Sequence, residues 1–264
     1  MNNVPAGCGW NWVLTGFSLF RKNPAMWAFM VFSYIMLMQL LGMVPVLGWL
    51  AATVLIPAFS ASFMIVSREL DLGKGLRFAL LFSGFSSNLP ALLRQGGLYL
   101  ASALAILGLS AMVDDGALLK LMVLGERPPA AAYENDGLAV AAALAGTLYL
   151  PLLAAFWFAP ALSAWQNLPA FQALFYSFFA VWRNWRAFLA YGLALVLLGL
   201  VCSLALFLLA LLLRGLLGSK SQDAFVLVVL PVMLSYVPIV FASFYASYRD
   251  IFPTRDAETA VRAQ

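Results

Sequence analysis

The residue types that carry most enzyme chemistry are scarce in this chain of 264 residues. The sequence has no histidine, which removes the commonest general base and metal ligand. The two cysteines, Cys8 and Cys202, stand far apart, so they form no disulfide framework or zinc-ligand spacing, and we expect both to be inert. Gly73-Lys74-Gly75 is too short for a phosphate-binding P-loop. The sequence therefore predicts no catalytic residue, no cofactor and no metal site, and we expect a protein that is not an enzyme.

The chemistry that the sequence does indicate is electrostatic contact with lipid. Five basic residues lie beside aromatic stretches and have few acidic neighbours: Arg68, Lys74, Arg77, Arg183 and Arg186. A basic residue near an anionic leaflet contributes about 1 kcal/mol to membrane binding. We expect these five to contact anionic headgroups, and the alternative is that they only orient the chain. The expected partners are membrane lipid and other membrane proteins, with no nucleic acid, since the net charge of +4 comes mostly from residues that flank apolar segments.

The composition is that of a membrane protein. Hydrophobic residues make up 64% of the chain and charged residues 10%, against about 45–50% and about 25% in soluble domains. Six uncharged segments are long enough to cross a bilayer as helices of about 20 residues: 25–44, 46–66, 95–113, 138–164, 187–213 and 224–247. The predicted fold class is all-α, a polytopic bundle of six transmembrane helices, because lipid-exposed backbone must satisfy its own hydrogen bonds.

One pattern occurs three times along the chain. An aromatic stretch leads to an asparagine, and an apolar hairpin follows whose second half contains a proline. The asparagines are Asn23, Asn88 and Asn184, and the prolines, which we expect to kink their helices, are Pro57, Pro160 and Pro238. The sequence predicts a single membrane domain over 1–264, made of repeat units at about 9–70, 76–166 and 170–249 and a tail at 250–264.

Each aromatic stretch has the spacing of an amphipathic helix with one aromatic stripe. The stripes are Trp10, Val13, Leu14, Phe17 and Phe20; then Phe78, Leu81, Phe82, Phe85 and Leu89; then Phe171, Leu174, Phe175, Phe178, Val181, Trp182 and Trp185. Such helices lie in the headgroup plane of a membrane. The third stretch is ambiguous, because 170–182 carries no charge and could belong to a membrane crossing.

The distribution of basic residues predicts the orientation. Most of the 15 lysines and arginines fall on one side of the six segments, which places both termini in the cytoplasm. No cleavable signal peptide is expected, because the first apolar stretch is longer than a signal sequence allows. On the opposite side, we expect one or two helical turns over the apolar part of the loop 116–135, followed by an extended segment at Pro128-Pro129.

Several motifs resemble those of an uncharacterised family of betaproteobacterial inner-membrane proteins. They are Ala6-Gly7-x-Gly9-Trp10-x-Trp12, Gly16-Phe17-x-Leu19-Phe20-Arg21-x-Asn23-Pro24-x-Met26-Trp27, and Pro57 with Arg68-Glu69-Leu70-Asp71. The layout is also similar to that of YciC-like proteins and of the membrane part of some glycerophosphodiester phosphodiesterases. The latter similarity implies a lipid-related role, although only 250–264 follows the last predicted span. No functional residues follow from these resemblances.

Two hypotheses of different classes remain. One is a non-enzymatic module that interacts with lipid or organises the membrane. The other is a transporter or channel for a small neutral or amphiphilic molecule, indicated by the prolines and by the uncharged polar residues Gln39, Thr53, Thr147, Ser235 and Tyr236. A polar cavity near the midplane would favour transport, and a lateral groove in a packed bundle would favour the module.

Overall fold

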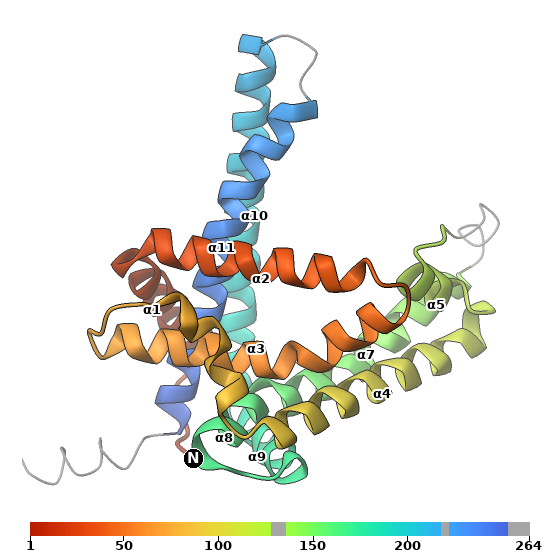
Figure 1. Ribbon diagram of the computed structural model, residues 1–264. Coiled ribbons are helices and arrows are strands. Elements are labelled where there is room, and N and C mark those ends of the chain that lie inside the picture. The colour runs from red at the N-terminus through yellow and green to blue at the C-terminus, as the bar shows by residue number, and fades with distance from the viewer. Residues whose placement is uncertain (128–135, 218–221, 253–264) are drawn as a thin grey trace, which may run out of the picture. The chain divides into compact units, whose positions relative to one another are not determined.

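The computed structural model describes residues 1–127, 136–217 and 222–252, and this part of the chain is helical and contains no strand (Figure 1). The elements are α1 Cys8–Lys22, α2 Pro24–Gly42, α3 Leu47–Asp71, the 3₁₀ helix η1 Phe78–Ser86, α4 Leu89–Asp114, α5 Ala117–Leu119, the π-helical turn η2 Lys120–Leu124, α7 Gly137–Trp157, α8 Ala159–Gln166, α9 Ala170–Arg183, α10 Trp185–Leu217 and α11 Gln222–Ile251. Among the described residues, six helices are long and apolar enough to cross a membrane: α2, α3, α4, α7 with α8, α10 and α11. The all-α class and the six predicted membrane helices are confirmed.

The helices group into two compact units. Unit 1 comprises 1–43, 59–87 and the described residues from 182 onward, and unit 2 comprises 44–58 and the described residues of 88–181. These boundaries differ from those of the expected repeat units, which stay a prediction.

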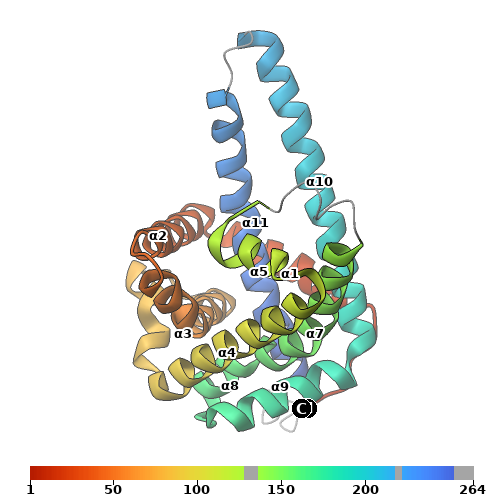
Figure 2. The ribbon, with the colours of Figure 1, turned by 90° about the vertical axis from the view of Figure 1, so that its right-hand side faces the viewer.

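In unit 1, α10 and α11 run side by side (Figures 1 and 2) and α1 packs against both of them. Two glycines bring α1 close to these helices. A Cβ atom at Gly9 would collide with backbone atoms of Ala187 and Tyr191, and one at Gly16 would collide with backbone atoms of α11. Trp12 and Leu19 lie on the same face and are buried. Small residues permit such an approach of two helices, so the glycines of α1 determine how it docks.

The aromatic stripe of α1 lies mostly away from this contact. Trp10, Leu14 and Phe17 are about half exposed, while Val13 is buried. The stripe is therefore available to surrounding lipid, as expected for a helix at a membrane surface.

The second aromatic stretch differs from our expectation. A 3₁₀ helix, η1, replaces the regular amphipathic helix, and with three residues per turn it buries Leu81 and Gly84 on one side. The Gly84 N–H donates to the hydroxyl of Ser62 in α3 at 2.9 Å. Phe78 and Phe82 are about 40% exposed. The tighter turn brings the Gly84 backbone to Ser62, while Phe78 and Phe82 stay partly exposed and contact the rings of Phe29 and Phe59.

In unit 2, α4 and α7 lie side by side (Figure 2). Gly96 of α4 is buried against the backbone of Val54, and a Cβ atom there would collide with the Val54 carbonyl. The glycine therefore sets the approach of α4 to the first part of α3, as Gly9 and Gly16 do for α1.

A serine from α9 interrupts the next membrane helix. In a continuous helix the Phe158 N–H would donate to the Ala154 carbonyl. Here the Phe158 N–H donates to Ser177 Oγ at 2.8 Å, and Ser177 Oγ donates to the Ala154 carbonyl at 2.8 Å. A side chain inserted in this way is a recognised cause of a helix kink. It accounts for the boundary between α7 and α8.

The third aromatic stretch forms α9, which ends before α10 begins at Trp185. Its buried face consists of small residues, namely Ala170, Ala173, Ser177 and Ala180, and its aromatic rings lie outward. The segment 170–183 is thus a helix of its own and not part of the α10 span.

The three prolines lie in different contexts. Pro57 and Pro238 are inside the continuous helices α3 and α11, where the expected kinks stay a prediction. Pro160 lies in the first turn of α8, immediately after the interruption at Phe158. A proline is tolerated in a first turn because its missing N–H has no intrahelical partner there.

The loop after α4 contains the expected helical turns. Asp114 accepts hydrogen bonds from the backbone N–H groups of Gly116 and Leu118 at 3.1 and 2.6 Å, and α5 and η2 follow. The expected extended segment at 128–135 lies outside the described residues.

The packing of α1 predicts the effect of a bulky residue at Gly16. We expect Gly16→Leu to displace α1 and lower the free energy of unfolding by about 3 kcal/mol or more, because overpacking alone costs about 1–3 kcal/mol and here the clash is with backbone. The apparent melting temperature in detergent measures this. Gly192→Leu is the matched control in the same unit, since no atom lies within 4 Å of a Cβ there. Equal melting temperatures for the two variants would contradict the proposed contact.

Candidate functional site

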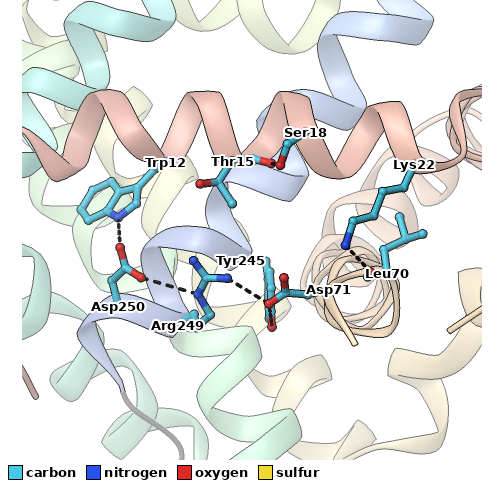
Figure 3. Close-up of polar contacts among 9 residues, drawn as sticks. All are labelled: Trp12, Thr15, Ser18, Lys22, Leu70, Asp71, Tyr245, Arg249 and Asp250. Carbon is cyan, nitrogen blue, oxygen red and sulfur yellow. Dashed lines mark hydrogen bonds and ion pairs between the residues drawn. The ribbon is translucent and has the colours of Figure 1, made fainter. Parts of the chain in front are cut away.

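The charged residues at the end of α11 form a paired network with α3 and α1 (Figure 3). The Asp71 carboxylate accepts from the Tyr245 hydroxyl at 2.9 Å and from the Arg249 guanidinium at 3.0 Å. The Asp250 carboxylate accepts from the Trp12 indole N–H at 2.9 Å and lies 3.6 Å from Arg249 Nε. Arg249 is thus shared between two carboxylates, and the network links three helices of unit 1.

The segment before α1 is held by the same region. The Asn184 side chain accepts from the Val4 N–H at 2.8 Å and donates to the Asn2 carbonyl at 3.2 Å. The Asn2 N–H donates to the Ile251 carbonyl at 2.8 Å. These bonds connect the amino-terminal residues with the start of α10 and the end of α11.

This network has the features of a structural clamp. Each carboxylate faces a donor, and Lys22 donates to the Leu70 carbonyl at 2.9 Å (Figure 3). In the described ranges, no group of three or more histidine, cysteine or acidic residues is placed to hold a metal ion. Burial, and then the Asp250 carboxylate, raise the pKa of the Cys8 thiol, which lowers its thiolate fraction and its reactivity.

All five predicted lipid-contact residues lie in unit 1, in two separate stretches of the chain. Lys74 forms an ion pair with Glu69 at 3.1 Å, so its charge is balanced locally. Arg68 is half-buried near the end of α3, and Arg77 is exposed just before η1.

The other two predicted lipid-contact residues, Arg183 and Arg186, lie in the second stretch, and both side chains are exposed. They lie on either side of Asn184. The Arg186 guanidinium lies 5.5 Å from the centre of the Trp185 ring, and the indoles of Trp182 and Trp185 are 68% and 56% exposed. Aromatic rings and basic side chains together are typical of the headgroup region of a membrane.

Unit 2 contains a cavity of about 540 Å³ that no sequence motif had indicated. Its walls are formed by the first part of α3, by α4 and by α7, and α5 and η2 contribute the remaining side chains. Lining residues include Trp49, Thr53, Tyr99, Leu107, Leu118 and Tyr149. The wall is mostly aliphatic and aromatic, which is the composition of sites for apolar ligands.

Three of the five polar residues named for a transport path are hydrogen-bonded within their own helices. The hydroxyls of Thr53, Thr147 and Ser235 each donate to a backbone carbonyl four residues earlier in their own helix, at 2.8–2.9 Å. This is the usual way for a hydroxyl to be satisfied in a membrane helix. They therefore lend little polarity to the interior.

Two buried polar contacts between helices were not predicted from the sequence. Gln95 is fully buried and donates to the Ala159 carbonyl at 3.1 Å and to Ser163 Oγ at 2.8 Å. Tyr191 and Ser243 form a buried hydrogen bond of 2.6 Å. An uncharged glutamine at the edge of an apolar segment was the available signal for the first contact, since such residues often bond between membrane helices.

Comparisons with known proteins give one informative relative. The chain is 38% identical over 260 residues to a protein of Burkholderia thailandensis described as a probable inner membrane protein, and the match covers 96% of this chain and 94% of that protein. No protein-family model matches, and no solved structure matches.

The network predicts unequal roles for two neighbouring tryptophans. Trp12→Phe keeps a ring in the buried site but removes the donor to Asp250, and hydrogen bonds to charged groups contribute about 1.5–3 kcal/mol. We expect a clear fall in the apparent melting temperature. Trp10→Phe is the control, since Trp10 is 50% exposed and should be tolerated. The assignment would be refuted by equal stability of the two variants.

Proposed function

We propose that this chain, which belongs to the family of the probable inner membrane protein of Burkholderia thailandensis, is a non-enzymatic module of the inner membrane that contacts anionic lipid. The chain is an integral membrane protein with six helices able to span a bilayer. The lipid-contacting role is our inference from the geometry at the junction of α9 and α10.

The observation that carries this proposal is the exposed cluster of Trp182, Arg183, Trp185 and Arg186. It lies where α10, a long apolar helix, begins, so its indoles and guanidinium groups are at the depth of lipid headgroups. The charges of Arg183 and Arg186 have no ion pair with any described acidic side chain. They can therefore attract the phosphates of an anionic leaflet.

We further propose that both termini are cytoplasmic. Basic residues gather at the amino-terminal ends of α2 and α10 and at the carboxy-terminal ends of α3 and α11. They outnumber the basic residues at the opposite ends of these helices, and such a bias orients membrane proteins. The cluster at the start of α10 then lies at the inner leaflet, where anionic lipids create a negative surface potential.

The alternative function is transport of a small neutral or amphiphilic molecule. A route for such a molecule would need polar groups along its length. Three of the candidate hydroxyls are already bonded within their own helices, and the cavity of unit 2 is apolar. These observations support a lipid-contacting module over a polar pathway.

Cysteine accessibility tests the orientation. In a variant without Cys8 and Cys202, we expect a membrane-impermeant maleimide to label Val46→Cys in intact spheroplasts, because Val46 lies in the exposed turn between α2 and α3. Leu72→Cys, which is 58% exposed after α3, should be labelled only after lysis. The opposite labelling pattern would reverse the topology.

Charge removal tests the lipid contact. We expect Arg183→Gln with Arg186→Gln to weaken binding of anionic phosphatidylglycerol about tenfold or more, since two basic residues contribute about 1 kcal/mol each. Native mass spectrometry of the purified protein would count the bound lipids. The loss should shrink in 1 M salt, where the screening length is about 3 Å.

The matched control removes the same charge from the opposite side of the chain. Lys120→Gln with Arg127→Gln should leave phosphatidylglycerol binding nearly unchanged. Both side chains are exposed, and both lie after α4, far along the chain from the cluster at 182–186. Equal losses in the two double variants would mean that net charge alone attracts lipid, and the proposal would fail.

A further inference from the structure

We propose that the cavity of unit 2 binds one acyl chain of a bilayer phospholipid. This inference deepens the proposed lipid-contacting function and rests on it. The cavity lies within a single compact unit, among the first part of α3, α4, α5, η2 and α7.

The cavity is large enough to hold an occupant. At about 540 Å³, it is several times larger than an engineered apolar cavity of about 150 Å³ that binds benzene. It also falls in the range of about 300–1,000 Å³ that is typical of ligand pockets. An unfilled space of this size would forfeit the dispersion contacts of every side chain around it.

The lining chemistry indicates which occupant fits. The polar side-chain atoms on the wall belong to Trp49, Thr53, Tyr99 and Tyr149. The Thr53 hydroxyl already donates to the Trp49 carbonyl, and the rings of Tyr99 and Tyr149 pack edge to face with centres 6.1 Å apart. Ordered water needs two to four polar partners, so the aliphatic remainder of this wall would hold water poorly. A hydrocarbon chain needs no hydrogen-bond partners and therefore fits this mostly apolar lining.

The length of the cavity matches one leaflet. Along α7 its lining runs from Ala142 to Leu153, a rise of about 16 Å at 1.5 Å per residue. This is about half of the roughly 30 Å hydrocarbon core of a bilayer. An extended acyl chain of a phospholipid occupies the same depth.

The opening of the cavity faces the bilayer. Ile56, Leu104 and Leu153 line the cavity, are each about 40% exposed, and belong to membrane-spanning helices. Lipid, which surrounds such surfaces, can therefore enter from the side. At the loop end, Leu118 of α5 is buried and closes part of the cavity. In the proposed orientation this end belongs to the outer leaflet.

Gly146 offers a way to fill the cavity without disturbing the packing. It lines the cavity, and no atom lies within 4 Å of a Cβ built there. We expect Gly146→Phe to place its ring in the space of the acyl chain. Gly108→Phe is the matched control, because Gly108 in α4 is equally open but does not line the cavity.

The probe is phosphatidylethanolamine with a diazirine in its acyl chain, incorporated into vesicles of phosphatidylethanolamine and phosphatidylglycerol that contain the full-length protein. After illumination, we expect crosslinks concentrated on peptides that contain the cavity residues of α4 and α7. Gly146→Phe should reduce these crosslinks about tenfold, and Gly108→Phe should leave them unchanged. Uniform labelling of all membrane helices, or equal labelling of the two variants, would overturn the proposal.

The experiment separates this inference from the proposed function. The probe is zwitterionic, so the variant with Arg183→Gln and Arg186→Gln should retain the cavity crosslinks while losing phosphatidylglycerol binding. Loss of the cavity crosslinks in Gly146→Phe with normal phosphatidylglycerol binding is the expected converse. If the cavity crosslinks are absent while the arginine variant behaves as expected, only the acyl-chain site fails.

Discussion

Close approach of helices at residues with little or no side chain is the constraint on which this structure depends. Inside a membrane, lipid tails are as apolar as leucine, so burying a large apolar side chain gives little driving force. Packing then depends on surfaces that fit together. Gly9 and Gly16 let α1 reach the backbones of α10 and α11, and Gly96 lets α4 reach α3. Where these contacts are made, Trp12 is buried with the glycines, and Trp10 and Phe17 of α1 are left on the other side.

The helices α1 and α9 follow this rule in the same register. Asn23 follows α1 and Asn184 follows α9. Counted back from these asparagines, the buried residues of the two helices stand at matching positions, so that Gly16 corresponds to Ser177. Gly16 lies against the backbone of α11 near Ser243, and Ser177 enters the backbone of α7 at Phe158. A shared register is expected of repeated units, and the repeat organisation stays a prediction.

The sequence was sufficient to predict the membrane helices, because exclusion of charge from long segments reflects the cost of placing ions in hydrocarbon. It also predicted surface helices with an aromatic stripe, but not that glycine, alanine and serine would make the buried contacts of α1 and α9. A stripe of aromatic residues in a soluble helix faces the core, whereas here the stripe is mostly outward and the buried residues include glycine and alanine.

The candidate sites were predictable to different degrees. The arginines at 183 and 186 could be proposed from their neighbours in the sequence, because tryptophan and arginine side by side indicate a headgroup environment. Their distinction from Lys74 required coordinates, since the ion pair of Lys74 with Glu69 depends on how the chain turns after α3. The 3₁₀ geometry of η1 was also hidden, because a spacing of three residues fits both helix types.

The cavity of unit 2 could not be predicted, because it is a property of volume and not of residue type. Its wall consists of the same leucine, alanine and tyrosine residues that elsewhere fill space between helices. What distinguishes it is that α4 and the first part of α3 meet closely at Gly96, whereas Gly146 of α7 has no neighbouring atom where a side chain would begin. Tight contact at one glycine and open space at another leave a gap the length of one leaflet. In a bilayer such a gap is surrounded by chains able to fill it, which is why an acyl chain is the occupant that the physical setting favours.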